Sequence, residues 1–368
     1  MSSSDVTRHG ITGERPGREA PPMRRGRRRR GSGGERLMVD RAEFSSYYGR
    51  PVIKAPSWSA QDIAGYFFLG GLAGAGSVLA AGAQLTGRPG MARVLKTTSA
   101  LAIAGSGALL VHDLGRPSRF ANMLRVFKPT SPMSVGSWLL TGYAPLAGLA
   151  AVLNRAGRLP RVGAAATAGA AVVGPAIATY TAVLAADTAV PAWHDAYREL
   201  PAVFAASALT AASGAALLGS PYSETGPARA AALLATTTEL ALVRGMRKRL
   251  GPVAEPYEQG RGGRCMHAAE VLTGVGAAAA ACSPFLPPPA RRPTAAAAGL
   301  ALLAASACTR FGVFHAGVAS AEDPVYTVGP QRERLEERRR AAEAAAKNGG
   351  TSPGADPSVP PSGGDTAG

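Results

Sequence analysis

Cysteine, histidine and charge are all scarce in this 368-residue sequence, and each scarcity excludes a class of protein. Only three cysteines occur, at Cys265, Cys282 and Cys308, and no two of them form a C-x-x-C pair. The chain therefore cannot ligate an iron–sulfur cluster or a structural zinc by itself, and it is no disulfide-stapled secreted domain. Charged residues make up 17% of the sequence, against about 25% in soluble domains, which argues against a soluble globular enzyme.

The charged residues that do occur are mainly basic and gather outside the middle of the chain. Lys and Arg number 40 against 24 Asp and Glu, which gives a net charge of +16. Nucleic-acid-binding proteins have such a balance, but membrane proteins share it because Lys and Arg gather in their cytoplasmic loops. Since residues 59–320 contain long uncharged runs, we favour a membrane protein and expect no nucleic-acid partner.

Both ends of the chain are predicted to be tails that flank one membrane domain. Residues 1–43 hold a polyarginine stretch followed by Gly and Ser, which is typical of a disordered basic tail. A twin-arginine export signal is rejected, because the residues after the arginines are polar. Residues 44–328 form the predicted membrane domain, and residues 329–368 are predicted to be a short charged helix and a disordered tail.

The middle of the chain predicts an all-α integral membrane protein with eight transmembrane helices. A helix crosses a bilayer with about 20 mostly apolar residues. The predicted spans are residues 62–86, 93–113, 135–154, 162–186, 200–219, 228–246, 267–286 and 294–318. The sixth is the weakest, because Glu239 and Arg244 interrupt it. The spans are rich in Ala and Gly, which favours close helix packing, although a GC-rich genome would enrich the same residues.

An even number of spans places both termini on one side of the membrane, which we call the near face. Its loops are residues 114–134, 187–199 and 247–266, whereas the far face has only the short turns near 87–92, 155–161, 220–227 and 287–293. Three tryptophans and four of the five histidines fall at the near face, namely Trp58, Trp138, Trp193, His112, His194, His267 and His315. This one-sided distribution predicts that the near face carries the activity or meets a partner.

Basic residues are more abundant at the near face than at the far face. The positive-inside rule therefore predicts a multi-pass protein of the cell membrane whose two termini are cytoplasmic. The bias is moderate, because the far turns also contain several arginines, including Arg88, Arg155 and Arg158.

One motif closes the second span with a concentration of polar chemistry. In His112-Asp113-Leu114-Gly115-Arg116-Pro117, an imidazole, a carboxylate and a guanidinium surround a Gly-x-Pro turn. In isolation, such a cluster also fits simple capping of a helix end. The segment from Asn122 to Trp138 follows it, and Tyr48-Gly49-Arg50-Pro51, Pro191-Ala192-Trp193 and Asp323-Pro324-Val325-Tyr326 occupy other near-face positions. In this order, on eight spans, these pieces resemble the NrfD/PsrC family over roughly residues 44–330.

This resemblance implies a fold, a function and partners. Members of the family have two four-helix bundles and are the quinone-reactive membrane subunits of molybdoenzyme complexes such as polysulfide reductase. The resemblance implies a quinone cofactor, menaquinone or ubiquinone, with no haem and no iron–sulfur cluster in this chain. The implied partners are membrane lipid, a four-cluster, ferredoxin-like iron–sulfur subunit and a molybdopterin catalytic subunit. The substrate of that subunit, such as formate, thiosulfate or polysulfide, is decided by another chain.

The resemblance also maps a quinone pocket, with a polar residue of the first helix at Tyr66 and a tyrosine of the fourth at Tyr180. Quinone exchange needs hydrogen-bond donors, an apolar slot and a proton route. His112 suits proton exchange near neutral pH, and Asp113 either orients that imidazole or carries the proton onward. We therefore predict His112, Asp113 and Tyr180 as catalytic residues, and Tyr66, Tyr180, His112, Asp113, Arg116 and Trp58 as cofactor-binding residues, with no metal ligand. Interfacial anchoring is the alternative role for each tyrosine.

Glu239 and Glu270 are the notable carboxylates inside the predicted spans, where charge is expensive and often functional. Glu270 follows His267 by three residues on one helix face, and Glu239 precedes Arg244 by five, which is a poor spacing for an intrahelical pair. The carboxylates either belong to a proton path or pair across helices, and we favour the structural role slightly.

Two other functional classes remain as alternatives, a b-type cytochrome anchor and a purely structural or transport protein. A cytochrome needs axial histidines at membrane depth on facing helices, whereas the histidines of the domain fall at or near helix ends. We therefore expect no haem bands in a reduced-minus-oxidised visible spectrum of the purified chain. Stoichiometric iron in a preparation free of partner subunits would contradict this.

Overall fold

The computed structural model describes residues 5–7, 10–12, 53, 56, 58–115 and 118–349. Near the N-terminus, the strands β1 (Asp5–Thr7) and β2 (Gly10–Thr12) pair antiparallel, with Val6 opposite Ile11. The rest of the predicted N-terminal tail and the end of the C-terminal tail lie outside the described residues.

Eight long helices coincide with the eight predicted spans: α7 has the predicted bounds, and each of the others begins or ends a few residues beyond them at one end or both. They are α1 (Ala60–Leu85), α2 (Pro89–Asp113), α4 (Pro132–Ala156), α5 (Pro160–Ala186), α7 (Leu200–Gly219), α8 (Gly226–Leu250), α9 (Gly260–Cys282) and α10 (Pro288–Glu322). Shorter elements connect or follow them: α3 (Ser118–Met123), α6 (Pro191–His194), α11 (Val325–Gly349), and the 3-10 helices η1 (Tyr222–Glu224), η2 (Gly251–Tyr257) and η3 (Ser283–Phe285).

Seven of these helices are long and apolar enough to cross a membrane, and α8 is the one that falls short among the described residues. Its interior carries Glu239 and Arg244, and its last turn is basic, with Arg247, Lys248 and Arg249. These are the charges that made the sixth span the weakest in the sequence. The described residues from 58 onward therefore form the all-α domain of a multi-pass membrane protein, in which α8 packs on α7 and α9 while lacking their apolar composition.

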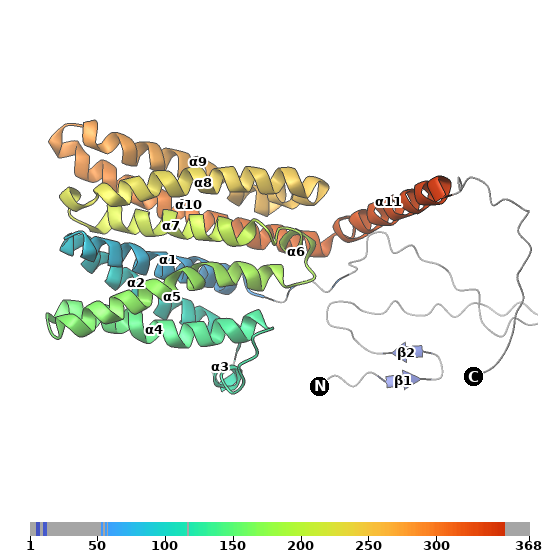
Figure 1. Cartoon of the computed structure of the whole chain (residues 1–368), viewed down its shortest axis with the longest axis horizontal. Coiled ribbons are helices and arrows are strands. Elements are labelled where there is room, and N and C mark those ends of the chain that lie inside the picture. The colour runs from blue at the N-terminus through green and yellow to red at the C-terminus, as the bar shows by residue number, and fades with distance from the viewer. Residues whose placement is uncertain are drawn as a thin grey trace, which may run out of the picture. The chain divides into compact units, whose positions relative to one another are not determined.

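The eight helices form two four-helix bundles that lie side by side (Figure 1). In the first bundle, α1 packs on α2 and α5, and α4 closes the ring by packing on the same two helices. In the second bundle, α7 and α10 pack on each other, and α8 and α9 close the ring. Because α1 also contacts α7 and α10, it is the central helix of the domain. This arrangement confirms the predicted fold.

Glycines allow the closest helix crossings in both bundles. A Cβ atom on Gly74 of α1 would collide with the carbonyl oxygen of Gly174 of α5, and the reverse also holds. Gly214 of α7 and Gly299 of α10 make the same mutual approach in the second bundle. The backbones therefore touch at these points, as expected for membrane helices that associate through small residues.

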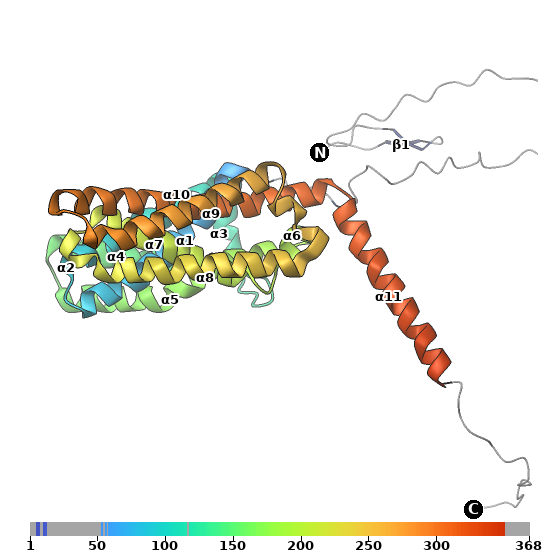
Figure 2. The ribbon, with the colours of Figure 1, turned by 90° about the horizontal axis from the view of Figure 1, so that it is seen from above.

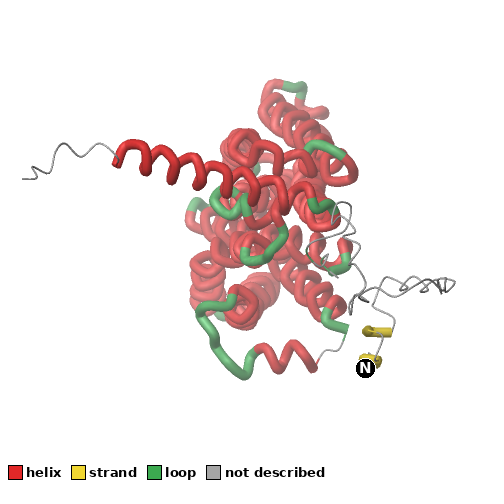
Figure 3. The backbone as a smooth tube through the Cα atoms, turned by 90° about the vertical axis from the view of Figure 1, so that its right-hand side faces the viewer, coloured by secondary structure: helices red, strands yellow, loops and turns green. Residues whose placement is uncertain are grey.

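The near-face ends of the helices carry most of the additional structure, and the far-face turns contain only the 3-10 helices η1 and η3. α3, α6 and η2 lie at the near face, and α11 leaves from the end of α10 and points away from the bundles (Figure 2). Seen from the near face, the longest loops turn toward the viewer and surround the ends of the helices (Figure 3). The far face has only short turns, so the two faces differ as the sequence predicts.

The Gly74–Gly174 crossing predicts a sharp difference between two glycines of the same helix. Gly74→Leu should destabilise the protein by roughly 1–3 kcal/mol or more, because the new side chain has no room against the α5 backbone. Gly82→Leu, further along α1, is the matched control, because no heavy atom lies within 4 Å of the position that a Cβ atom on Gly82 would take. The melting temperature in detergent measures both, and equal values for the two variants would contradict the crossing.

Candidate functional site

Two tyrosines meet inside the first bundle, close to its near-face end. The hydroxyl of Tyr66 on α1 hydrogen-bonds to the hydroxyl of Tyr180 on α5, and the two rings are edge to face with centroids 6.3 Å apart. Both side chains are buried. Each lies six residues from the near-face end of its helix, at Ala60 and Ala186, which corresponds to a depth of about 9 Å.

Local packing fixes the position of each ring. The Ser106 hydroxyl of α2 donates to the backbone oxygen of Tyr66, 3.1 Å away, and the Phe67 ring lies beside the Tyr66 ring. Gly136 of α4 faces Tyr180 so closely that a Cβ atom there would enter the ring. Gly136 therefore provides the space that the Tyr180 ring occupies.

A carboxylate and an imidazole lie between this pair and the near face. His112, at the end of α2, contacts Asp62 in the first turn of α1, with 3.0 Å between Nδ1 and Oδ2. The Asp62 side chain is 11% exposed, whereas the His112 side chain is 79% exposed. Because Asp62 precedes Tyr66 by four residues, the two share one face of α1. The Asp62–His112 pair therefore leads from the level of the tyrosines to the surface.

The remaining predicted site residues have other surroundings. Asp113 does not orient His112 through any described contact; its Oδ1 accepts a hydrogen bond from the Ser59 backbone N–H at 3.2 Å, and so secures the start of α1. Trp58 stacks on Trp193 of α6, with ring centroids 5.7 Å apart. Arg116 lies outside the described residues. Of the predicted set, the structure thus brings Tyr66 and Tyr180 into contact and ties Trp58 to α6.

Sequence reasoning missed Asp62. Ser59 accepts a hydrogen bond from the Asp62 backbone N–H, and an acidic residue in the first turn is common at helix starts. A role at the helix start explains Asp62 from the sequence alone. Its contact with His112 depends on the end of α2 lying beside the start of α1, which the sequence does not show. The four-residue spacing to Tyr66 was the available signal.

A chain of aromatic contacts connects the tyrosine pair with the second bundle. The Phe67 ring lies 5.7 Å from the Phe204 ring of α7, measured between centroids. The Arg310 guanidinium of α10 stands over the Phe204 ring at 3.7 Å and donates to the Phe204 carbonyl oxygen at 2.7 Å. Arg310 is fully buried, and its Nε and Nη1 have no hydrogen-bond partner among the described residues.

The intramembrane carboxylates have different partners. Glu270 pairs with Arg247 of α8 at 2.7 Å, so it joins neighbouring helices across their interface. Glu239 is buried and accepts hydrogen bonds from the hydroxyls of Thr210 and Thr309, at 3.0 and 2.8 Å. Glu270 therefore has the structural role that we favoured, which is pairing across helices. Glu239 instead joins α7, α8 and α10 through hydroxyl donors.

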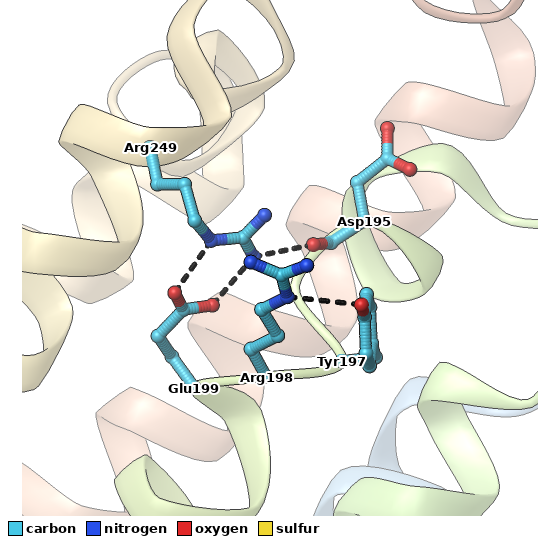
Figure 4. Close-up of polar contacts among 5 residues, drawn as sticks. All are labelled: Asp195, Tyr197, Arg198, Glu199 and Arg249. Atoms are coloured by element: carbon cyan, nitrogen blue, oxygen red, sulfur yellow. Dashed lines mark hydrogen bonds and ion pairs between the residues drawn. The ribbon is translucent and has the colours of Figure 1, made fainter.

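At the near face, a polar cluster joins the end of α8 to the loop that precedes α7 (Figure 4). Arg249, at the end of α8, binds both carboxylate oxygens of Glu199 at 2.5 Å and donates to the Asp195 carbonyl oxygen. Arg198 donates to the Tyr197 hydroxyl at 2.9 Å. Asp195, Tyr197 and Arg249 also line a near-face cavity of about 370 Å³, which reaches Tyr326 on α11. The loop before α7 is thereby held to α8.

These groups define what the site can do chemically. Two buried phenols offer hydroxyl groups that can donate hydrogen bonds, and a carboxylate–imidazole pair can accept and donate protons at the surface. Over residues 58–115 and 118–349, no group of three or more His, Cys, Asp and Glu side chains is placed to hold a metal ion.

Comparison with known families agrees with the motifs. The family model "Polysulphide reductase, NrfD" matches residues 54–230, which include the whole first bundle together with α6 and α7. Tyr66, His112, Asp113 and Tyr180 all lie within the matched stretch. No curated protein matches the chain at a significant level. The predicted family resemblance is thereby confirmed.

The Glu199–Arg249 pair predicts an acid-dependent stability. Hydrogen bonds from Arg249 lower the pKa of the Glu199 carboxyl, and this effect outweighs partial burial, which acts in the opposite direction. The resulting stabilisation is fully present above the ordinary pKa of 4.5 and is lost as the pH falls below it toward the lowered folded-state pKa.

Arg249→Gln should therefore lower the melting temperature modestly at neutral pH, and the difference from wild type should shrink below pH 4.5. Arg244→Gln, an exposed position on the same helix, is the control and should show no such trend. A difference between Arg249→Gln and wild type that stays constant with pH would contradict the role of the pair.

Proposed function

Because residues 54–230 match the NrfD family model, we propose that the chain is the quinone-reactive membrane subunit of an oxidoreductase complex. In this proposal it passes electrons between the membrane quinone pool and an iron–sulfur partner subunit, which serves a molybdopterin catalytic subunit. The observation that carries the proposal is the meeting of Tyr66 and Tyr180, two buried phenols from different helices within the family-matched segment.

The residues present fit a quinone. A quinone ring needs an apolar slot and hydrogen-bond donors for its carbonyl oxygens. Tyr66 and Tyr180 supply two phenolic donors at one depth, Phe67 supplies an aromatic wall beside them, and Gly136 makes room for the Tyr180 ring itself. A bound menaquinone or ubiquinone supplies the two-electron, two-proton chemistry. The task of the tyrosines is to orient the ring by donating from their hydroxyls.

Protons reach the site through Asp62 and His112 in this proposal. The Asp62 carboxylate lies one helical turn from Tyr66 and contacts His112 Nδ1 at 3.0 Å. The largely exposed His112 ring connects the pair to the near-face medium, because one nitrogen of an imidazole can accept a proton while the other donates one. The pair therefore holds a proton at Nδ1 or Oδ2 between the buried phenols and the surface. Asp113 has a positioning role, because it secures the backbone from which α1 begins.

The iron–sulfur partner is proposed to dock on the near face. The candidate site lies about 9 Å from that face, on the side that carries α3, α6 and the ordered Glu199–Arg249 cluster. Trp58 and Trp193 stack at the junction of α1 and α6, and so hold the surface between the site and the loops. Electrons then have a short route to clusters in the partner, with no redox cofactor in this chain.

The loop charges predict that this docking surface faces the cytoplasm of a cell whose plasma membrane holds the protein. A C-terminal fluorescent protein fusion should therefore be bright, and the matching alkaline phosphatase fusion should be inactive. The reverse pattern would place the near face, and the partner with it, on the other side of the membrane.

Tyr180→Phe tests the proposed site, because it removes one hydroxyl and leaves the ring beside Gly136. Loss of a hydrogen bond to a reacting oxygen is worth roughly 1–3 kcal/mol, so quinone-linked turnover of the assembled complex should fall about ten- to a hundredfold. Activity with a dye that bypasses this chain should be unchanged. Asp62→Asn should also lower quinone-linked turnover selectively.

Tyr143→Phe is the matched control. Tyr143 is a buried tyrosine of the same bundle, but its hydroxyl bonds to Ser77 and to the Ala73 carbonyl oxygen, deeper in the membrane. This variant should keep the wild-type ratio of quinone-linked to dye-linked activity. If Tyr180→Phe behaves like Tyr143→Phe, the proposed pocket is wrong.

A further inference from the structure

A second cavity lies at the opposite end of the first bundle, at the far face. Its volume is about 290 Å³, and its wall comes from the α1–α2 turn, the α4–α5 turn and the starts of α2 and α5. The polar side chains of its lining are Gln84, Arg88, Lys96, Asn154 and Arg158. The cavity is separate from the tyrosine pair, which belongs to the near-face end.

The charge of this cavity has one sign. Arg88, Lys96 and Arg158 line it, and no Asp or Glu does. Over residues 58–115 and 118–349, none of these three cations forms an ion pair within 4 Å. Arg158 is exposed and Arg88 is half-buried, whereas Lys96 is buried, and burying a cation without a counter-charge is unfavourable. The arrangement therefore attracts an anion.

Lys96 is the most demanding of the three cations. It lies seven residues from the start of α2, about 10 Å below the far-face end, and is 5% exposed. Its Nζ donates to the Gln84 side-chain oxygen at 2.5 Å, which accounts for one of three ammonium donors. A buried ammonium group on the wall of a cavity is a favourable binding group for an anionic ligand.

The start of α5 adds a second source of positive potential. Pro160 and Gly163, from its first turn, line the cavity, and no side chain caps this helix start. The helix dipole at this start favours an anion, although Pro160 has no N–H group and the Gly163 N–H is already bonded to the Leu159 carbonyl oxygen at 3.0 Å. The start of α2 contributes less, because the Glu224 carboxylate already accepts from the Met91 N–H at 2.7 Å.

We propose that this far-face cavity is a phosphate-binding site. Its position at the end of the spanning helices points to the phosphodiester headgroup of an anionic phospholipid, and the apolar Ala92, Leu153 and Ala164 of its wall suit the start of the attached acyl chains. Free inorganic phosphate offers the same chemistry and is the other source. The site also gives a role to far-face arginines, which the proposed near-face function leaves unused.

Native mass spectrometry of the detergent-purified chain, with added phosphatidylglycerol or phosphatidylcholine, tests the proposal. We expect phosphatidylglycerol to bind with saturation and phosphatidylcholine to bind at least about tenfold more weakly. Arg158→Gln, at an exposed position, should weaken phosphatidylglycerol binding about tenfold or more, and Arg88→Gln/Arg158→Gln should weaken it further. A separate arm measures thermal stabilisation by inorganic phosphate.

Arg155→Gln/Arg161→Gln is the matched control, because it removes two positive charges beside the α4–α5 turn, as Arg88→Gln/Arg158→Gln removes two from the far face, and neither Arg155 nor Arg161 lines the cavity. Saturable binding of either probe that is lost in the cavity variants and kept in the control supports the site, and the probe that binds identifies the source. Absence of binding by both probes, or equal loss in cavity and control variants, overturns it. Neither result depends on the quinone activity.

Discussion

The contact between the backbones of α1 and α5 is the constraint on which the rest of the structure depends. Gly74 and Gly174 touch, so the two antiparallel helices have one possible separation at that level. Tyr66 lies eight residues from Gly74 and Tyr180 lies six residues from Gly174, both toward the near face. The crossing therefore brings two side chains that are 114 residues apart in sequence into hydrogen-bonding contact. A bulkier residue at the crossing would separate them.

The second bundle meets the same helix through polar groups rather than through the tyrosines. Gly71 of α1 gives room for the Arg310 guanidinium, whose Nη2 would lie 3.0 Å from a Cβ atom there. Arg310 in turn packs on Phe204, which contacts Phe67 beside Tyr66. Two glycines thus let α1 pack on both sides. Gly74 allows a backbone contact with α5, and Gly71 makes room for the buried Arg310 of α10. This explains why α1 can stand between the bundles.

The sequence was sufficient for the fold because each helix has its own local signal. Apolar runs bounded by turns placed all eight helices, and the weakness of the sixth span followed from Glu239 and Arg244. The pairing of Tyr66 with Tyr180 required the family resemblance, because nothing local connects two distant tyrosines. The contacts of Asp62, Lys96 and Arg310 were not predicted, since each is a single polar residue whose partner comes from another helix or another turn.

The central claim is that a quinone ring lies between α1 and α5 at the level of the tyrosine pair. Photolabelling of the purified complex with an azido-quinone, followed by mass spectrometric mapping of the modified peptides, tests it most directly. The account predicts labels on the segments around Tyr66 and Tyr180, and competition by excess unmodified quinone. Specific, competable labels confined to the second bundle or to the far-face turns would contradict it.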